Sequence, residues 1–320
     1  MTLDLPAADR RSTLLQTLTY FTVFVALGLG GVTLGPTLQG LASNTGSTLG
    51  QISVVFAARS LGYMIGSFVA GRVYDRRAGH PVIAVLLVVM SVTLGLVPLM
   101  PLLALLVAVL FVLGLAEGGV DVGGNTMLVW LHGSRVGPYM NGLHFAWGVG
   151  AFISPIIIAQ AVLASGDITL AYWLLAALVL PPAVVLLRQP SPRMSTHAAG
   201  RPSGRLNVRL LALVLAFFFS YVAAEVTMGG WIFTYAVAMG QTDQTTAAYL
   251  TSVFWGSLTL GRLLSVPLAS RWSPATVLQV DLIGCLASVA LILLLPRSAA
   301  AIWIGTCGTG LFMASMFPTM

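Results

Sequence analysis

Long apolar runs separated by short polar breaks make up most of this chain. Each run is about 20 residues long, which is the length that an α-helix needs to cross the hydrocarbon core of a bilayer. The breaks carry Pro, Gly and Arg, which end helices or favour water. The pattern predicts ten membrane-spanning helices: Leu14–Leu34, Gly50–Ala70, Pro81–Leu99, Leu102–Trp130, Tyr139–Leu163, Ile168–Leu187, Leu210–Tyr235, Ala247–Ala269, Ala275–Leu295 and Ala299–Thr319.

Composition agrees with an all-α membrane protein. Hydrophobic residues make up 58% of the 320 residues and charged residues only 8%, whereas a soluble domain has about 25% charged residues. The net charge of +6 would suggest nucleic acid in a soluble protein. Here the basic residues are Arg and fall mostly in the breaks, so we expect lipid around the chain and no nucleic-acid partner. We also expect a monomer.

The Arg residues alternate between the two sides of the predicted membrane. One side carries Arg10, Arg11, Arg72, Arg76, Arg77, Arg135, Arg188, Arg193, Arg201, Arg205, Arg209 and Arg271, and the other carries Asp167, Asp243 and Arg297. Cytoplasmic loops are the ones rich in Arg and Lys. The chain is therefore predicted to be a multi-pass protein of the cytoplasmic membrane, with its N-terminus and central loop inside.

A polar, Pro-rich and Arg-rich stretch divides the predicted spans into six and four. We expect residues 1–188 to form an N-terminal six-helix bundle, 189–208 a cytoplasmic linker, and 209–320 an incomplete C-terminal bundle. A shift of 199 residues places Gly30 on Gly229 and Gly62 on Gly261, which predicts two pseudo-symmetric halves. The repeat also predicts that the last span continues past Met320 and is followed by two more. Parallel repeats of this kind occur in transporters with a midplane site between the halves.

Three polar residues stand four positions apart inside the fourth apolar run. Glu117, Asp121 and Asn125 therefore share one helix face. A carboxylate at the bilayer centre costs about 2.5–3.5 kcal/mol on insertion scales, and such residues face a bundle interior or a water-filled cavity. The face is predicted to line a polar site.

The loop between the second and third predicted spans resembles a signature of the major facilitator superfamily. Gly71, Asp75, Arg76 and Gly79 match its Gly, Asp-Arg and Gly positions, although Gly79 lies four residues after Asp75 where the signature has three. The resemblance implies two six-helix halves that rock around a central site. It also implies that Gly71, Asp75 and Arg76 form a gating loop that stabilises the closed cytoplasmic face.

Longer stretches are similar to the fucose:proton symporter family and its sodium-dependent glucose transporter branch. They are Leu115–Asn125, Pro138–Phe145, Gly148–Ala151, Tyr221–Glu225 with Gly229–Trp231, and Phe254–Gly256 with Gly261-Arg262. In that family an acid four residues before an Asn lines the sugar cavity, and Asp121 and Asn125 match these positions. The symporters also carry an acid in the first helix shortly before a Pro, where this chain has Gly31-Val32 before Pro36. A two-carboxylate proton scheme is therefore not expected, and Na⁺ coupling or uniport is favoured.

The acidic candidates each have two interpretations. Asp121 either binds sugar hydroxyls and exchanges a cation, or is tied to Arg59 at similar depth. Glu117 either shares a proton with Asp121, or is a protonated acid bonded to a backbone carbonyl. Glu225, the acid of the seventh span, is expected to line the cavity from the other half.

The neutral candidates also have two interpretations. Asn125, Asn141 and His144 suit a polyhydroxylated ligand, or they bond neighbouring helices. Trp231, with Tyr235 and Trp255, offers flat faces to a pyranose ring, or belongs to an interfacial belt.

Other polar residues are expected to be structural. Arg262 and Asp281 lie at comparable depth and are expected to pair, and Cys285 and Cys307 are expected to be packing residues. No nucleotide, metal or nucleophile motif points to an enzyme.

We therefore predict a secondary active transporter that moves a small molecule, most simply a hexose, with a cation and no other cofactor. The coupling ion is H⁺ or Na⁺. The alternatives are a proton-coupled drug or metabolite exporter, and a non-transporting membrane receptor of the same fold.

Overall fold

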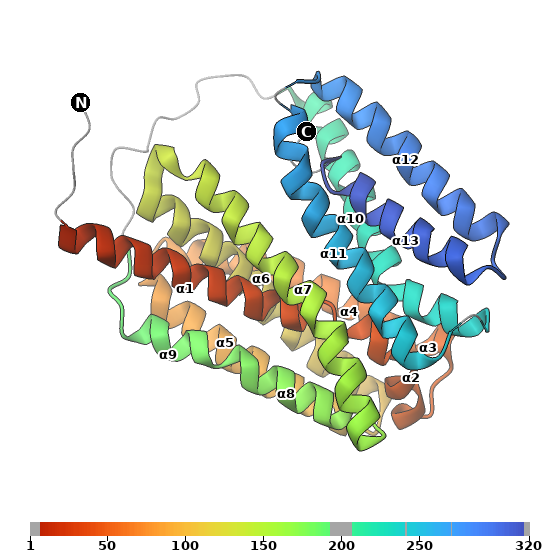
Figure 1. The fold of residues 1–320 in the computed structure, drawn as a ribbon. Coiled ribbons are helices and arrows are strands. Elements are labelled where there is room, and N and C mark those ends of the chain that lie inside the picture. The colour runs from red at the N-terminus through yellow and green to blue at the C-terminus, as the bar shows by residue number, and fades with distance from the viewer. Residues whose placement is uncertain (1–6, 193–206, 241, 270, 317–320) are drawn as a thin grey trace.

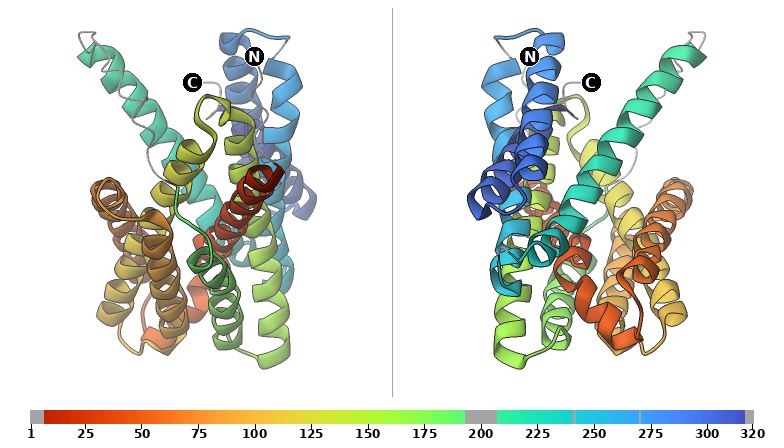
Figure 2. Two further views of the ribbon diagram at one scale, coloured as in Figure 1. Left: turned by 90° about the vertical axis from the view of Figure 1, so that its left-hand side faces the viewer. Right: turned by 90° about the vertical axis from the view of Figure 1, so that its right-hand side faces the viewer.

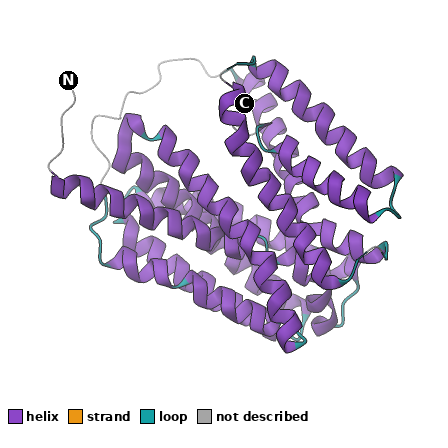
Figure 3. Ribbon diagram, viewed as in Figure 1, coloured by secondary structure: helices purple, strands orange, loops and turns teal. Residues whose placement is uncertain are grey.

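The chain folds into a bundle of α-helices, shown here in a computed structural model (Figures 1 and 3). The structure describes residues 7–192, 207–240, 242–269 and 271–316, and contains no strand within them. The linker residues 193–206 and the predicted end of the last span lie outside the described residues. The elements are α1 (Ala7–Gly31), α2 (Leu34–Thr45), α3 (Leu49–Ile52), α4 (Val54–Tyr74), α5 (Gly79–Leu96), η1 (Val97–Leu99), α6 (Leu103–His132), η2 (Gly133–Arg135), α7 (Gly137–Ser165), α8 (Thr169–Val179), α9 (Pro181–Leu187), α10 (Val208–Ala238), α11 (Gln244–Ala269), α12 (Pro274–Leu294) and α13 (Ala299–Met313).

Each of the ten predicted spans coincides with a helix or a pair of consecutive helices. In the described part of the chain, eight segments are long and apolar enough to cross a membrane. Helix α11 is not among those eight, and α13 has the right composition but only 15 residues. The all-helical membrane bundle is thus confirmed, while the count of ten spans stays a prediction.

The first predicted span breaks between α1 and α2. Pro36 has no N–H to donate to the Val32 carbonyl, and its ring would clash with that carbonyl in a continuous helix. Near the end of α1 the carbonyl of Gly30 accepts from the Thr33 backbone N–H at 3.4 Å, the Thr33 hydroxyl at 3.0 Å and Nη2 of Arg59 at 2.7 Å. The break places a helix C-terminus inside the bundle, where the cation of Arg59 offsets its partial negative charge.

Glycine lets α4 and α6 pack backbone against backbone. A Cβ built on Gly62 or Gly66 would lie 2.1 Å from a carbonyl oxygen of α6, and one on Gly114 or Gly118 would lie 2.1 Å from a carbonyl oxygen of α4. Small residues four apart on both helices are typical of close membrane packing. This contact fixes the register of the two helices that carry the polar residues.

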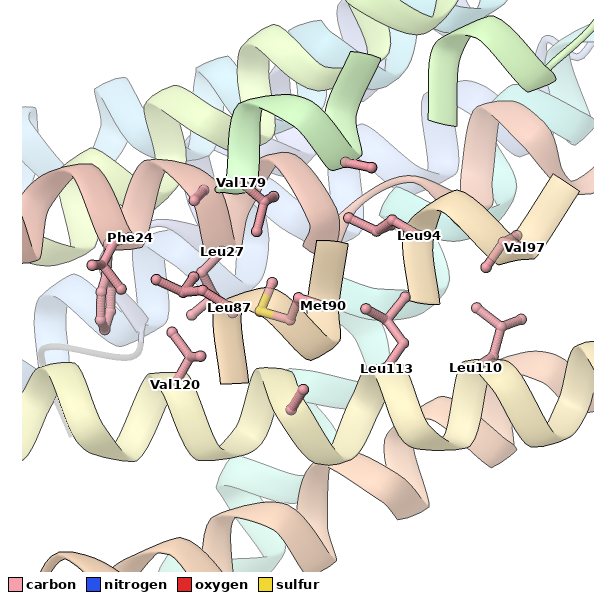
Figure 4. Close-up of a cluster of buried hydrophobic side chains, with 14 of the residues drawn as sticks. Phe24, Leu27, Leu87, Met90, Leu94, Val97, Leu110, Leu113, Val120 and Val179 are labelled. Carbon is pink, nitrogen blue, oxygen red and sulfur yellow. The ribbon is translucent and has the colours of Figure 1, made fainter. Parts of the chain in front are cut away.

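The largest apolar core lies among α1, α5, α6 and α8. Figure 4 shows Phe24, Leu87, Met90, Leu113 and Val179 converging from these four helices, and all five are fully buried. The interior of α1–α9 is therefore closely packed around the helices that line the site.

Helices α10–α13 form a second group beside α1–α9 (Figures 1 and 2). The two groups meet where α7 packs along α11 and where α2 packs on α10. Asp243 precedes α11 and accepts hydrogen bonds from the Thr246 backbone N–H and hydroxyl. The backbone bond holds the pKa of the Asp243 carboxyl below its usual value, as is typical of a helix N-cap.

Candidate functional site

A cavity of about 890 Å³ lies between the two groups of helices. Its wall is built by α1, α2, α4, α6 and α7 on one side and by α10, α11 and α12 on the other. The volume falls within the usual range of small-molecule sites, about 300–1,000 Å³. The polar and charged lining residues are Arg59, Ser60, Tyr63, Glu117, Asp121, Asn141, His144, Glu225, Arg262 and Ser265.

The cavity opens at the end of the bundle that carries the Arg-rich breaks. Trp272 and Pro274, in and just after the break between α11 and α12, line it and are exposed. At the opposite end α2 lies against α10, where a Cβ on Gly35 would stand 2.7 Å from the carbonyl oxygen of Gly229. The described residues therefore place the mouth of the cavity at the Arg-rich end and a close contact of two helices at the other.

Arg59 of α4 and Glu117 of α6 form a buried ion pair in the cavity wall. The Arg59 Nε donates to Glu117 Oε2 at 2.8 Å and its Nη2 donates to Oε1 at 2.5 Å. Their side chains are 9% and 4% exposed. Glu117 was expected either to share a proton with Asp121 or to be protonated and bonded to a backbone carbonyl. Neither holds, because its carboxylate is paired with the guanidinium of Arg59. The interpretation that tied Asp121 to Arg59 is wrong for the same reason.

Asp121 lies one turn further along α6 and faces the cavity without such a partner. Its Oδ1 accepts from Asn125 Nδ2 at 3.2 Å, and Tyr63 of α4 also interacts with it. Among the described residues, no Arg or His nitrogen lies within 4 Å of its carboxylate. Asp121 is thus a carboxylate whose charge is open to a cation or a proton from the cavity.

Glu225 of α10 and Arg262 of α11 face each other across the second half of the wall. The Arg262 Nη2 lies 3.8 Å from Glu225 Oε1, and the side chains are 22% and 12% exposed. Tyr221, one turn before Glu225, interacts with both. The predicted pair of Arg262 with Asp281 is wrong, because the two side chains point to different neighbours: Arg262 enters the cavity, and Asp281 accepts from the Ser315 hydroxyl.

Aromatic and aliphatic side chains together form the apolar wall. Trp147 of α7 and Trp255 of α11 meet edge to face with ring centroids 5.2 Å apart, and both line the cavity. Trp147 was not among the predicted binding residues, and it lies between the family-like stretches Pro138–Phe145 and Gly148–Ala151. His144 lines the cavity one turn before Trp147 and packs edge to face on Phe24.

The structure brings five of the seven predicted binding residues to the cavity: Glu117, Asp121, Asn141, His144 and Glu225. Asn125 is not in the lining and bonds to Asp121, while Trp231 packs on Phe56 with centroids 5.7 Å apart. Tyr235 also lies outside the lining and donates to the Ile292 carbonyl.

The predicted gating loop lies at the Arg-rich end, outside the cavity lining. Gly71 is in the last turn of α4, Asp75 caps that helix, and Arg76 is exposed. Cys285 and Cys307 are free thiols in α12 and α13. Among the described residues, no three His, Cys, Asp or Glu side chains gather as they would around a metal ion.

Comparison with known proteins gives this arrangement its context. Residues 18–320 match the family model of the Major Facilitator Superfamily. The chain is 29% identical to sodium-dependent glucose transporter 1A of Mus musculus and 31% identical to sodium-dependent glucose transporter 1 of Xenopus laevis. These matches cover 93% and 89% of this chain, and 79% and 64% of the relatives. The chain therefore spans less than two thirds of the length of the second relative.

Solved transporters share the fold at low identity. The nucleoside transporter NupG superposes with a TM-score of 0.76 at 15% identity, over 95% of this chain and 81% of its own. The D-xylose-proton symporter superposes with a TM-score of 0.68 at 14% identity, over 96% of this chain and 82% of its own. A helical bundle with one central cavity and a match over nearly the whole sequence lead to one assignment. The chain belongs to the Major Facilitator Superfamily.

Proposed function

We propose that this protein carries a neutral hexose across the cytoplasmic membrane together with one cation, by alternating access of the central cavity. The observation that carries the proposal is the Asp121 carboxylate, which faces the cavity with no cationic partner among the described residues. Two relatives named sodium-dependent glucose transporters support the choice of sugar and cation. In this proposal the cavity opens to the cytoplasm, since its mouth lies at the Arg-rich end.

The charges of the cavity wall support a neutral substrate with a cation. Arg59 and Arg262 face Glu117, Asp121 and Glu225, which leaves one excess negative charge when all carboxylates are ionised. An uncompensated charge at membrane depth is expensive. A bound cation or proton at Asp121 removes the cost, so cation binding stabilises the loaded cavity.

The test is sugar uptake into proteoliposomes under an imposed pH gradient or Na⁺ gradient. We expect wild-type protein to accumulate glucose, mannose or fucose under one of the two gradients. Asp121→Asn should lose gradient-driven accumulation but keep sugar exchange at equal concentrations, because only the coupling group is removed. Asp167→Asn makes the same change in an exposed loop and serves as the matched control.

Each result decides one part of the proposal. Absence of sugar uptake under both gradients would contradict sugar transport. Full accumulation by Asp121→Asn would contradict the coupling role of Asp121.

Export of apolar compounds is the second candidate. It is favoured by the aromatic lining of the cavity, which includes Phe24, Phe56, Phe145, Trp147, Trp255 and Trp272. In that case the same vesicles would show proton-driven movement of an apolar cationic dye and no sugar uptake. A non-transporting receptor would bind a ligand and move neither.

A further inference from the structure

The pair Glu225 and Arg262 differs from the other ion pair of the cavity in a way that bears on substrate binding. Arg59 makes two charge-assisted hydrogen bonds to Glu117 and a third to the Gly30 carbonyl. Its side chain is buried, so its hydrogen-bonding capacity is largely used within the protein. Arg59 therefore acts as part of the scaffold.

Arg262 is held much less closely. Its Nη2 lies 3.8 Å from Glu225, which is longer than a hydrogen bond, and its side chain is more than twice as exposed as that of Arg59. A guanidinium has five N–H donors in a planar fork. Tyr221 interacts with both side chains, but one hydroxyl cannot use five donors and four acceptor positions. Arg262 therefore retains donors at the cavity wall, and Glu225 beside it retains acceptors.

The position of Arg262 places these donors opposite the first half of the molecule. The charge of Arg262 acts on His144 of α7, and both residues line the cavity. Asn141, almost one turn before His144, lines it as well. A ligand in the cavity that reaches Arg262 and either Asn141 or His144 would thus contact both halves through polar groups.

We propose that Arg262 and Glu225 form the second-half subsite of the sugar. The Arg262 fork donates to adjacent hydroxyl oxygens, and Glu225 accepts from a hydroxyl hydrogen. Vicinal hydroxyls offer the combination of acceptors and donors that such a pair requires. The assignment rests on the proposed sugar transport and makes Arg262 a specificity-determining residue.

The experiment compares glucose with its 2-, 3-, 4- and 6-deoxy derivatives as competitors of glucose uptake. The variants are Arg262→Gln and Glu225→Gln, and Arg297→Gln makes the same change at an exposed residue on the other side of the bundle. A hydrogen bond to a charged group corresponds to a factor of about 10 to 100 in binding. Wild type should discriminate against at least one deoxy sugar by about that factor.

In Arg262→Gln this discrimination should disappear for the deoxy sugar that lacks the contacted hydroxyl, and persist for the others. A residue that only supports the fold would lower the amount of active protein and leave the ranking of the deoxy sugars unchanged. If Arg262→Gln does not fold, Arg262→Lys keeps the charge but lacks the fork, and the same comparison applies.

Two outcomes overturn the proposal, and they are distinct. If wild type transports glucose and the ranking is the same in wild type and Arg262→Gln, the subsite is wrong and sugar transport stands. If wild type transports no sugar under either gradient, both the subsite and the proposed sugar transport are wrong.

Discussion

Arg59 and Glu117 join α4 to α6 through two hydrogen bonds, and the same guanidinium donates to the Gly30 carbonyl where α1 ends. One side chain thus links three helices at the depth of the cavity. The arrangement satisfies a carbonyl at the end of α1, where a helix lacks its usual backbone donors. A buried charged network of this kind is costly to leave half complete.

The first prediction concerns this pair. Glu117→Gln should lower the free energy of unfolding in detergent by about 3–5 kcal/mol, because Arg59 keeps a buried charge with no counter-charge. The double variant Arg59→Met with Glu117→Leu should recover most of the loss, since neither charge remains. Denaturant titration of the purified variants measures both values. A double variant no more stable than Glu117→Gln would contradict the ion-pair explanation.

The second prediction concerns the glycines between α4 and α6. Gly62→Ala and Gly114→Ala should each destabilise the protein by about 1–3 kcal/mol, because the added methyl would stand 2.1 Å from a carbonyl oxygen and must separate the helices. Gly95→Ala in α5 is the control, since nothing lies within 4 Å of its added Cβ. The measurement is thermal unfolding of the three variants. Equal melting temperatures would contradict the close packing.

The polar face of the fourth span shows what helix spacing alone could predict. The four-residue spacing placed Glu117, Asp121 and Asn125 on one helix face, and the first two line the cavity while Asn125 does not. It could not say which of the two acids binds Arg59, because both lie within one turn of the same depth. That choice is made by the register of α4 on α6, which depends on the glycine contacts between two separate helices.

The same limit explains the remaining differences at the site. Arg262 and Asp281 were predicted to pair from their depth, but depth does not fix which face of each helix meets the cavity. The position of Trp147 in the cavity wall could not be predicted. The sequence of an apolar helix does not tell whether an aromatic side chain faces lipid or a cavity. The break between α1 and α2 was also not predicted, because hydropathy continues without interruption through Gly31 and Leu34.

The third prediction concerns the start of the linker. His80 of α5 meets the Tyr20 hydroxyl at 2.7 Å and the Gln189 carbonyl at 3.0 Å, and its backbone N–H donates to the Ser191 hydroxyl. His80→Ala removes the two side-chain bonds, worth about 1–3 kcal/mol together. Trypsin cleavage after Arg188 should therefore accelerate about 5- to 100-fold if it follows local opening.

The control for this prediction is His132→Ala. His132 also lies near the Arg-rich end, where it bonds to Thr17 and stacks on Tyr139, and it makes no hydrogen bond to the described linker residues 189–192. Its removal should leave the cleavage rate after Arg188 unchanged. Equal acceleration in both variants would mean that the rate follows general loosening and not the contact between His80 and the linker.

The fourth prediction concerns closure of the cavity opposite its mouth. Gly35 of α2 lies against the carbonyl oxygen of Gly229 of α10, so a larger side chain at residue 35 cannot fit while the two helices touch. Gly35→Leu should therefore favour a state in which this end is open. Sugar uptake should fall at least tenfold while the amount of folded protein stays near wild type.

Labelling of a cavity cysteine can detect this state. Met64→Cys lines the cavity and is half-exposed, and replacing Cys285 and Cys307 by Ala removes the other thiols. In oriented membranes, a membrane-impermeant thiol reagent should label Met64→Cys from the Arg-rich side in the parent protein. With Gly35→Leu it should label mainly from the opposite side.

Gly95→Leu provides the control with open space around the added side chain. Unchanged sidedness in Gly35→Leu would show that the contact between Gly35 and Gly229 does not close the cavity, whereas reversed sidedness would identify α2 and α10 as its gate.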